Sequence, residues 1–310
     1  MSSKNTLNNP LLLSFLTNLG KKASPGFARF LLKSFQSLRN VARPWDGNQQ
    51  CLIANLKKVF HDEKSIQEIQ QIASECLYLR SWVLYDLYHY NDNMPALRKR
   101  IHLTPQAEEF VAYCQKSTGA IAVSSHFVSS DVIGMELAQR INNVQVISVP
   151  DPDRSYQQEN KMRENFGIRV TPASMKALQQ VSETLRQGGL VATGVDRAYP
   201  DEPHEMNFFG SPALLPTFYI RLALRYNVPI FHFSGTRLLS GEYILNAQGP
   251  IWPERSESIQ NDITINMQKI ITLTEKEIQA HPEQWGMFHP VWKEQIIKEE
   301  LQNGKKRKKR

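Results

Sequence analysis

The sequence predicts an α/β protein, in which a central, mostly parallel sheet is flanked by helices and preceded by a helical region. Two observations support this prediction. Short apolar segments of strand length alternate with amphipathic segments of roughly 10 to 15 residues, as in right-handed βαβ units. The apolar segments also lack the alternation of half-exposed strands, which is typical of parallel strands covered on both faces. The 310 residues, 41% of them hydrophobic, suffice for one large or two ordinary domains.

The expected elements of the α/β region follow from these patterns. Strands are predicted at residues 120–125, 144–149, 168–170, 190–195 and 229–233, with an antiparallel edge strand at 242–247. Helices are predicted from Asp131 onward and at 156–166, 175–186, 217–226 and 263–278. Upstream, apolar residues recur at helical spacing through residues 48–90, which we expect to form helices that pack on the sheet.

The distribution of charge divides the chain into four parts. Residues 1–45 hold seven basic and no acidic residues, and residues 305–310 are all Lys or Arg, which leaves 24 basic against 30 acidic residues elsewhere. We expect basic amphipathic helices at 1–45, a helical region at 46–100, the α/β domain at 101–296 and a polybasic tail at 297–310. Because the excess basic charge lies at the two ends, a high pI does not indicate a nucleic-acid-binding face.

The first 45 residues combine apolar side chains with Lys and Arg at helical spacing. With low overall hydrophobicity, this pattern is typical of a helix in the plane of a membrane surface. A helix that packs on its own domain has the same pattern, and an acid-poor terminus also resembles a transit peptide. We expect no membrane-spanning helix, because no apolar run reaches about 18 residues. Three cysteines without a CxxC pair suit a reducing compartment.

A histidine and an aspartate, His126 and Asp131, lie where the strand at 120–125 gives way to a helix. On one continuous helix this five-residue offset is about 500° of rotation, which would put the two side chains on different faces. After a strand, a connecting turn can instead bring the carboxylate to the imidazole, at the edge where open α/β sheets bind ligands. We predict that Asp131 orients His126 as a general base. The alternative is that Asp131 only caps the helix.

Several segments together with this HxxxxD motif resemble a known family. Two of them are GGLVATGVDRAYPDEPHEMNFFGSPALLPTF, from residue 188, and HPEQWGMFHPVW, from residue 281. Weaker matches are ARPWDGNQQCLIANLKKVF and RENFG. In combination they resemble the bacterial lipid A late acyltransferases and the related phosphatidylinositol mannoside acyltransferases, and the resemblance covers most of the chain.

The resemblance implies an O-acyltransferase that moves a fatty acyl group from acyl-CoA or acyl carrier protein to a hydroxyl of a lipid or glycolipid acceptor. His126 would deprotonate that hydroxyl in a ternary complex, and neither a metal nor an organic cofactor is expected. The protein would lie at the cytoplasmic face of the cell membrane, as a peripheral protein on an anionic surface. Nucleic acid is not an expected partner.

Five further residues are candidates for binding substrate. Asp196 and Arg197 directly follow the strand at 190–195, so they are expected at the same sheet edge as His126. The resemblance implies that this block binds the acceptor's polar or phosphate group, for which an Arg fork is suited. A surface ion pair is the alternative for Arg197. Arg163 matches an arginine that lies near the site in the family.

Phe208 and Phe209, in the FFG segment, are the other two candidates. They are expected either to form an apolar wall for the acyl chain or to pack as a turn on the sheet. His289 and Trp292 are interpreted as structural.

Two functions of other classes remain open. One is a thioesterase or lipid hydrolase, which would use the same groove with water as the acceptor. The other is a non-catalytic adaptor that uses only its basic ends at a membrane surface. The absence of GxSxG, GxGxxG, GxxxxGK[ST] and HExxH motifs disfavours serine hydrolases, dinucleotide enzymes, P-loop proteins and zincins. The histidines also lack metal-ligand spacing, so no metal site is expected.

Overall fold

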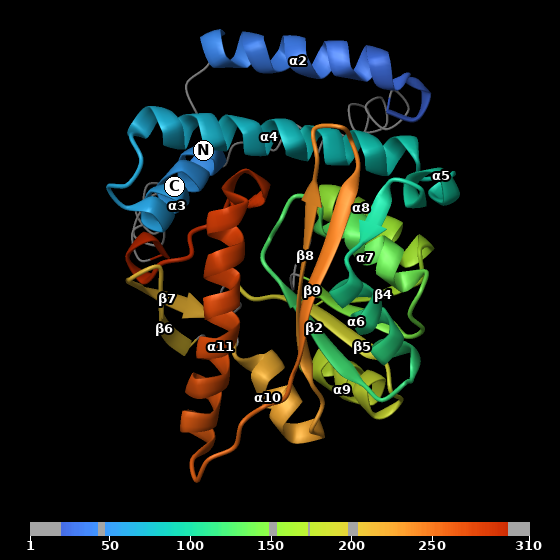
Figure 1. Cartoon of the computed structure of the whole chain (residues 1–310), viewed down its shortest axis with the longest axis vertical. Coiled ribbons are helices and arrows are strands. Elements are labelled where there is room, and N and C mark those ends of the chain that lie inside the picture. Colours follow the sequence, from blue (N-terminus) through green and yellow to red (C-terminus); the bar gives the residue numbers. More distant parts are fainter. Residues whose placement is uncertain (1–19, 43–46, 149–153, 173, 198–203, 297–310) are drawn as a thin grey trace, which may run out of the picture.

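The computed structural model describes residues 20–42, 47–148, 154–172, 174–197 and 204–296. It confirms the α/β prediction: a seven-stranded sheet is flanked by helices, and further helices lie across one end of the molecule (Figure 1). The expected tail at 297–310 and most of the expected first helices, residues 1–19, lie outside the described residues.

The sheet is parallel except at one pairing, between β8 and β9. Its order is β1-β9-β8-β2-β5-β3-β4. The strands are β1 (Ile101–Leu103), β2 (Ala120–Ser124), β3 (Val144–Ser148), β4 (Ile168–Pro172), β5 (Leu190–Gly194), β8 (Ile230–Arg237) and β9 (Tyr243–Ile251). Because β2 lies between β5 and β8 and is parallel to both, the carboxyl ends of these three strands meet at one edge.

All six predicted strands and all five predicted helices of the α/β region are present, although one strand has a different place in the sheet. The segment expected at 242–247 is antiparallel to β8 as predicted, but it is not the edge strand, because the short β1 pairs with its other side. The confirmed helices are α7 (Ser130–Ala138), α8 (Arg154–Asn165), α9 (Met175–Arg186), α10 (Phe218–Tyr226) and α11 (Ile259–Ala280). Helix α6 (Pro105–Gln115), which begins after a Thr104 cap, was not expected.

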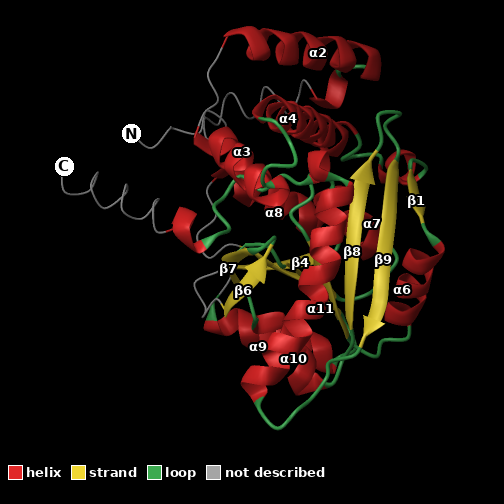
Figure 2. Ribbon diagram, turned by 60° about the vertical axis from the view of Figure 1, so that its left-hand side comes forward, coloured by secondary structure: helices red, strands yellow, loops and turns green. Residues whose placement is uncertain are grey.

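Each face of the sheet has its own hydrophobic core, because neighbouring residues of a strand point to opposite faces. In β2, Ile121 and Val123 belong to the core beneath α11, whereas Ala120 and Ala122 belong to the core beneath α6 and α7. Figure 2 shows α11 and α6 on opposite sides of β8 and β9. The strands of the sheet centre are thus covered on both faces, as their continuous apolar sequence predicts.

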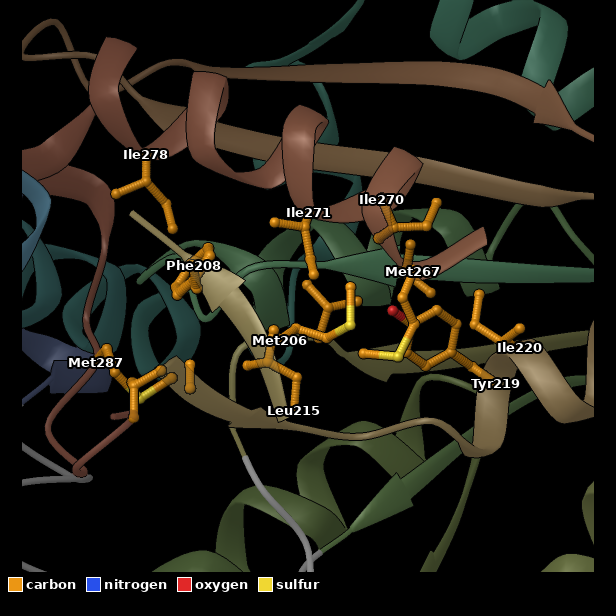
Figure 3. Close-up of a cluster of buried hydrophobic side chains, with 14 of the residues drawn as sticks. Met206, Phe208, Leu215, Tyr219, Ile220, Met267, Ile270, Ile271, Ile278 and Met287 are labelled. Carbon is orange, nitrogen blue, oxygen red and sulfur yellow. The ribbon is translucent and has the colours of Figure 1, made fainter. Parts of the chain in front are cut away.

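A two-stranded hairpin completes the core beneath α11. It consists of β6 (His204–Phe208) and β7 (Ser211–Leu215), which are antiparallel. Figure 3 shows apolar side chains of this hairpin meeting those of α11. At its turn, Phe209 and Gly210 both have positive φ, 49° and 69°, a backbone conformation that glycine adopts readily and phenylalanine rarely.

Long helices lie across the edge where β2, β5 and β8 end. These are α3 (Gly47–Phe60) and α4 (Ile66–His89), followed by the short α5 (Met94–Arg98). Helix α4 begins with a capping box, in which Ser65 and Glu68 each bind the other's backbone N–H. Helix α2 (Pro25–Ala42) lies on the outer side of α4 (Figure 1), where Ala23 and Ala28 pack with Trp82 and Tyr85. None of the described helices is both long and apolar enough to cross a bilayer.

Candidate active site

His126 lies two residues beyond the end of β2, at the edge of the sheet that faces α4. The preceding residues of the strand are fully buried, whereas the His126 side chain is 33% exposed. The imidazole is therefore held by the fold and remains accessible from outside, which a group that exchanges protons with a substrate requires.

The carboxylate that binds the imidazole is Asp196, which follows the neighbouring strand β5. The distance between His126 Nδ1 and Asp196 Oδ1 is 2.5 Å, and the His126 backbone N–H donates to Asp196 Oδ2 at 2.9 Å. Asp196 is fully buried. Burial alone would raise the pKa of this carboxyl group, but the charge of His126 and the hydrogen bonds from His126 and Trp285 lower it overall. Asp196 is thus a carboxylate directed at Nδ1.

The PEQW segment, near the C-terminal end of the described chain, also contacts the His126–Asp196 pair. Trp285 Nε1–H donates to Asp196 Oδ2 at 2.7 Å, so the oxygen that does not bind the ring has two donors. The same segment pairs with the loop that carries His126, through a bridge between Phe127 and Trp285. The Gly286 N–H donates to the carbonyl of His126 at 2.9 Å, and the Val128 N–H donates to the carbonyl of Gln284 at 2.8 Å.

Gln284 and a buried ion pair extend these contacts to α4. The Gln284 side chain binds both the backbone N–H and the carbonyl of Arg237, on β8, at 3.1 Å each. Arg237 Nε donates to Asp86 of α4 at 3.0 Å, and Tyr243 donates to the same carboxylate at 2.7 Å. All these side chains are buried, so the loop that carries His126 is tied to α4 through satisfied polar groups.

Three glycines let the His126 loop approach its neighbours closely. A Cβ atom on Gly194, the last residue of β5, would lie 2.6 Å from His126 Cε1. A Cβ on Gly286 would lie 2.9 Å from Val128, and one on Gly235 would lie 2.3 Å from Ile133 of α7. The imidazole therefore lies directly against the backbone of β5, where no other amino acid leaves enough space.

Asp131 does not occupy the position that its spacing from His126 predicted. Its carboxylate binds Arg163 of α8, with 2.7 Å between Arg163 Nε and Asp131 Oδ1. The physical reason is the direction of α7, which begins at Ser130 after a turn held by Trp285, so that its first turn faces α8. Asp131 is not the helix cap either, because Ser129 occupies that position. The spacing predicted that Asp131 binds His126, whereas the carboxylate at His126 Nδ1 in the structure is that of Asp196.

Arg163 is buried, as a residue near the site would be and a solvated helix cation would not. Besides Asp131 it binds Asn160 Oδ1 at 2.5 Å, and its guanidinium lies 5.1 Å from the ring centre of Tyr156. Burial alone would lower the pKa of Arg163, but the negative charge of Asp131 and its hydrogen bond raise this pKa overall. The guanidinium therefore stays charged and joins α7 to α8 beside the loop that carries His126.

Phe208 and Phe209 lie in the core beneath α11. Phe208 is 1% exposed and stacks on Trp292, with ring centres 5.7 Å apart, and Trp292 donates to the Phe208 carbonyl at 3.0 Å. The Phe209 backbone is held by its N–H to Glu275 and by its carbonyl to His61. These contacts correspond to the packed turn that was the second expectation for the FFG segment. Trp292 has the structural position that was expected.

Sequence reasoning gave no role to Trp285, Gln284 or Gly194, which complete the site. Trp285 and Gln284 belong to the PEQW segment that the family resemblance already included, and this was the available signal. Gly194 gave none, because a glycine at the end of a strand is common. Within the described residues, no group of three or more His, Cys, Asp and Glu side chains is arranged to hold a metal ion.

The structure thus defines an α/β protein in which a buried aspartate binds Nδ1 of a partly exposed histidine, at the edge of the sheet where open α/β folds bind ligands. The family model described as bacterial lipid A biosynthesis acyltransferase matches residues 28–294. The chain belongs to this family.

Two curated relatives are phosphatidylinositol mannoside acyltransferases of Mycobacterium tuberculosis. The protein of strain ATCC 25618 / H37Rv is 26% identical over 181 residues, and that of strain CDC 1551 / Oshkosh is 25% identical over 181 residues. Each alignment covers 56% of this chain and 54% of the relative. The chain thus spans about half the length of the curated relatives it matches.

Proposed function

We propose that the chain is an O-acyltransferase, which moves a fatty acyl group from a thioester donor to a hydroxyl of a lipid or glycolipid. The observation that carries this proposal is the partly exposed His126, with Nδ1 bound by the buried Asp196. An aspartate at Nδ1 sets the tautomer, so that Nε2 has a free lone pair and accepts a proton. Membership of an acyltransferase family supports the choice of reaction.

In the proposed reaction His126 Nε2 takes the proton from the acceptor hydroxyl as its oxygen attacks the thioester carbonyl. The tetrahedral intermediate then expels the thiolate, and the imidazolium returns the proton to this sulfur. Asp196 stabilises the imidazolium between the two steps. A positioned base contributes about 10²–10⁴-fold, so the rest of the rate enhancement comes from holding donor and acceptor together.

In this proposal Asp196, and not Asp131, orients the base. Asp131 and Arg163 act beside it, since their ion pair fixes the start of α7 against α8. Arg197 contacts the substrate's polar group. We do not include Phe208 and Phe209 in the substrate site, because an acyl chain would reach them only after the hairpin had moved.

The test is an assay of the purified protein with a radiolabelled acyl-CoA, or acyl carrier protein, and phospholipid or glycolipid vesicles. We expect a labelled lipid to appear at the same rate as the donor releases its acyl group. His126→Ala should abolish both. The matched control is His102→Ala, which removes an exposed histidine from β1. Acyl release without a labelled lipid would identify a thioesterase instead. If His126→Ala left the function of the protein in cells unchanged, the result would favour a non-catalytic membrane adaptor.

The donor and acceptor are further parts of the proposal. Acyl-CoA and acyl carrier protein are both candidate donors, and comparing the two in the same assay decides between them. Lipid analysis of a deletion strain beside its parent, and beside the strain complemented with His126→Ala, identifies the acceptor class. A lipid that loses one acyl chain in the deletion and the His126→Ala strain, but not in the parent, is the expected result.

We also propose that α2 binds an anionic membrane surface, as a peripheral attachment at the cytoplasmic face. Its inner side packs on α4 through Ala28, while Phe27 and Phe30, 48% and 67% exposed, remain outside. Exposed Arg29 and Lys33 lie on the same helix. Each cation near an anionic surface contributes about 1 kcal/mol to binding, and the exposed rings add apolar contact with lipid.

Sedimentation with anionic vesicles tests this attachment. We expect Phe27→Ser with Phe30→Ser to lower binding about tenfold and high salt to weaken what remains. The control pair is Trp252→Ser with Ile259→Ser, which removes exposed apolar side chains just after β9 and at the first residue of α11. Equal binding by both double variants would contradict the proposal. Removing residues 305–310 tests the basic tail separately.

A further inference from the structure

Asn55 occupies a position of α3 where the helical pattern predicts an apolar side chain. Leu52, Leu56 and Val59 form the buried face of this helix, and all three belong to the core beneath α11. Residue 55 lies on the same face, three positions after Leu52 and four before Val59. Asn55 is nevertheless fully buried. A buried amide is unfavourable at such a position unless its hydrogen bonds compensate for the loss of water.

Both hydrogen bonds of the Asn55 side chain go to the segment that follows Trp285. Asn55 Nδ2 donates to the carbonyl of Met287 and to that of His289, at 2.9 Å each. Residues 286–290 belong to no helix or strand, so their carbonyls have no regular partners. Asn55 Oδ1 is buried, and no group of the described chain donates to it. Asn55 therefore acts as a donor, which joins α3 to two points on one irregular segment.

The segment that Asn55 holds carries the indole that binds Asp196. Trp285 comes two residues before the first of the held carbonyls, and its Nε1–H donates to Asp196 Oδ2 at 2.7 Å. Between them, the Gly286 N–H donates to the carbonyl of His126 at 2.9 Å. The direction of the indole depends on the path of this short stretch, because a side chain follows its backbone. A shift of the segment would therefore move the hydrogen-bond donor of Asp196 and loosen the loop of His126.

We propose that Asn55 is a positioning residue for the His126–Asp196 pair. Its two N–H groups set the direction of the Trp285 indole, and through the indole they maintain the hydrogen bond to Asp196. The proposal rests on the acyl-transfer function proposed above and deepens it, because it adds a residue of α3 to the site. Asn55 acts through Trp285 and not on the substrate, so its loss should lower kcat and leave KM unchanged.

The first experiment observes the indole and needs no turnover. The full chain is prepared with isotope-labelled tryptophan, and the indole signal of Trp285 is identified by nuclear magnetic resonance as the one missing from Trp285→Phe. A hydrogen bond to a carboxylate is a strong one and displaces an N–H signal downfield. We therefore expect Asn55→Leu to move this signal upfield, by more than any other tryptophan signal. Asn55→Ser keeps one donor and should move it less, and it replaces Asn55→Leu if that variant does not fold.

The matched control is Asn266→Leu. Asn266 is also a buried asparagine, on α11, and its Nδ2 donates to the carbonyls of Glu254 and Asp262 at 2.8 Å each. Glu254 belongs to a segment outside helices and strands, as Met287 does, but that segment carries no residue of the site. We expect the thermal midpoint to fall at least as far in the control as in Asn55→Leu, while its Trp285 signal stays in place.

The second experiment measures acyl transfer by the same variants, well below their thermal midpoints. Asn55→Leu should lower kcat about tenfold without a change in KM, whereas Asn266→Leu should keep its kcat, because only the first variant displaces a group that orients the base. Asn55→Leu should lower kcat no further when it is combined with Trp285→Phe, since the indole through which Asn55 acts is already absent.

The positioning role is overturned if the Trp285 signal moves no more in Asn55→Leu and Asn55→Ser than in Asn266→Leu. It is also overturned if the losses in kcat from Asn55→Leu and Trp285→Phe multiply. The two proposals can fail separately. A Trp285 signal that moves as expected, in a protein that transfers no acyl group, keeps the positioning of the indole and refutes the proposed function. Acyl transfer with an unmoved signal keeps the function and refutes the positioning role.

Discussion

Two aspartates lie near His126, and they differ in every property that decides whether a carboxylate can orient an imidazole. Asp131 is five residues away in sequence, on the first turn of α7, and binds Arg163. Asp196 is 70 residues away, at the end of β5, and binds the ring at 2.5 Å. Asp196 is fully buried, whereas the side chain of Asp131 is 28% exposed.

This difference shows that the register between parallel strands, and not the spacing within one loop, brings the pair together. Ser124 and Gly194 are directly paired across β2 and β5. His126 and Asp196 each lie two residues beyond this pair, so they are at equivalent positions beyond the ends of the two strands. A loop between a strand and a helix has no such constraint, and here it turns Asp131 towards α8.

The largest expected effect comes from exchanging each aspartate for asparagine. Asp196→Asn should lower turnover by about 10²–10⁴-fold, because an amide can favour the wrong imidazole tautomer; in serine proteases the same exchange costs about 10⁴-fold. Asp131→Asn should lower turnover less than about tenfold. Acyl transfer is measured beside the thermal midpoint of each variant. Adding Asp196→Asn to His126→Ala should cost little more, because residues that act as a unit are not additive.

The comparison between the aspartates would be reversed if Asp131→Asn lost more turnover than Asp196→Asn. In that case the contact seen at Nδ1 would not be the one used in the reaction.

A methyl group on β5 should have the next largest effect. Gly194→Ala would place a carbon 2.6 Å from His126 Cε1, so the ring must leave its present position, in which it binds Asp196. Because a displacement of about 1 Å can cost 10²-fold, we expect turnover to fall by about 10–100-fold. The control is Gly134→Ala on α7, whose new carbon would lie 3.7 Å from Ile168, an ordinary contact. It should keep full turnover and gain about 0.5–1 kcal/mol of stability. Equal turnover in both variants would contradict the close packing of the imidazole.

Removing one hydrogen bond to Asp196 should have a smaller effect. Trp285→Phe deletes the Nε1–H that binds Oδ2, and we expect about tenfold lower turnover with about 1–3 kcal/mol lower stability. Trp292→Phe is a matched control, because this buried indole donates to the Phe208 carbonyl instead. Its stability should fall similarly while kcat stays unchanged. If both variants lost turnover in proportion to stability, Trp285 would have only a packing role.

The smallest effect on turnover is expected from the Asp131–Arg163 pair, which should act on stability. Asp131→Asn leaves the buried guanidinium with only the longer contact to Glu159, at 3.9 Å, so we expect a loss of about 1–3 kcal/mol in urea unfolding, less than for a fully buried pair because Asp131 is partly exposed. Glu183→Gln, which breaks the exposed pair with Arg186, should cost almost nothing. Similar unfolding midpoints for the two variants would show that the Asp131 pair does not fix α7.

Much of the fold was predictable because the sheet is buried on both faces. Apolar segments such as residues 190–195 have no alternation, and the helices between them have clear faces, so strand and helix types followed from periodicity. The three-residue β1 was too short to give a pattern. The β6–β7 hairpin was not predicted because its turn is Phe209-Gly210, whereas the recognisable sequences for such turns have Asn or Asp before the glycine.

The site was predictable as a location but not as a set of contacts. Strand ends identify His126, Asp196 and Arg197 as neighbours of one sheet edge, and the structure places Asp196 on the imidazole. The order of strands cannot be read from periodicity, so the pairing of β2 with β5 was unknown. The contact of Trp285 with Asp196 joins residues 89 apart and depends on the path of the chain after α11. No local pattern contains that information.

The distance in sequence between the parts of the site has a consequence for synthesis of the chain. His126 leaves the ribosome first, Asp196 follows 70 residues later, and Trp285 another 89 residues after that. Until Trp285 is in place, the His126 loop lacks the segment that pairs with it, and Asp196 lacks one of its hydrogen-bond donors. The three parts of the site therefore come together only in the last stage of translation, after about nine tenths of the 310 residues have been made.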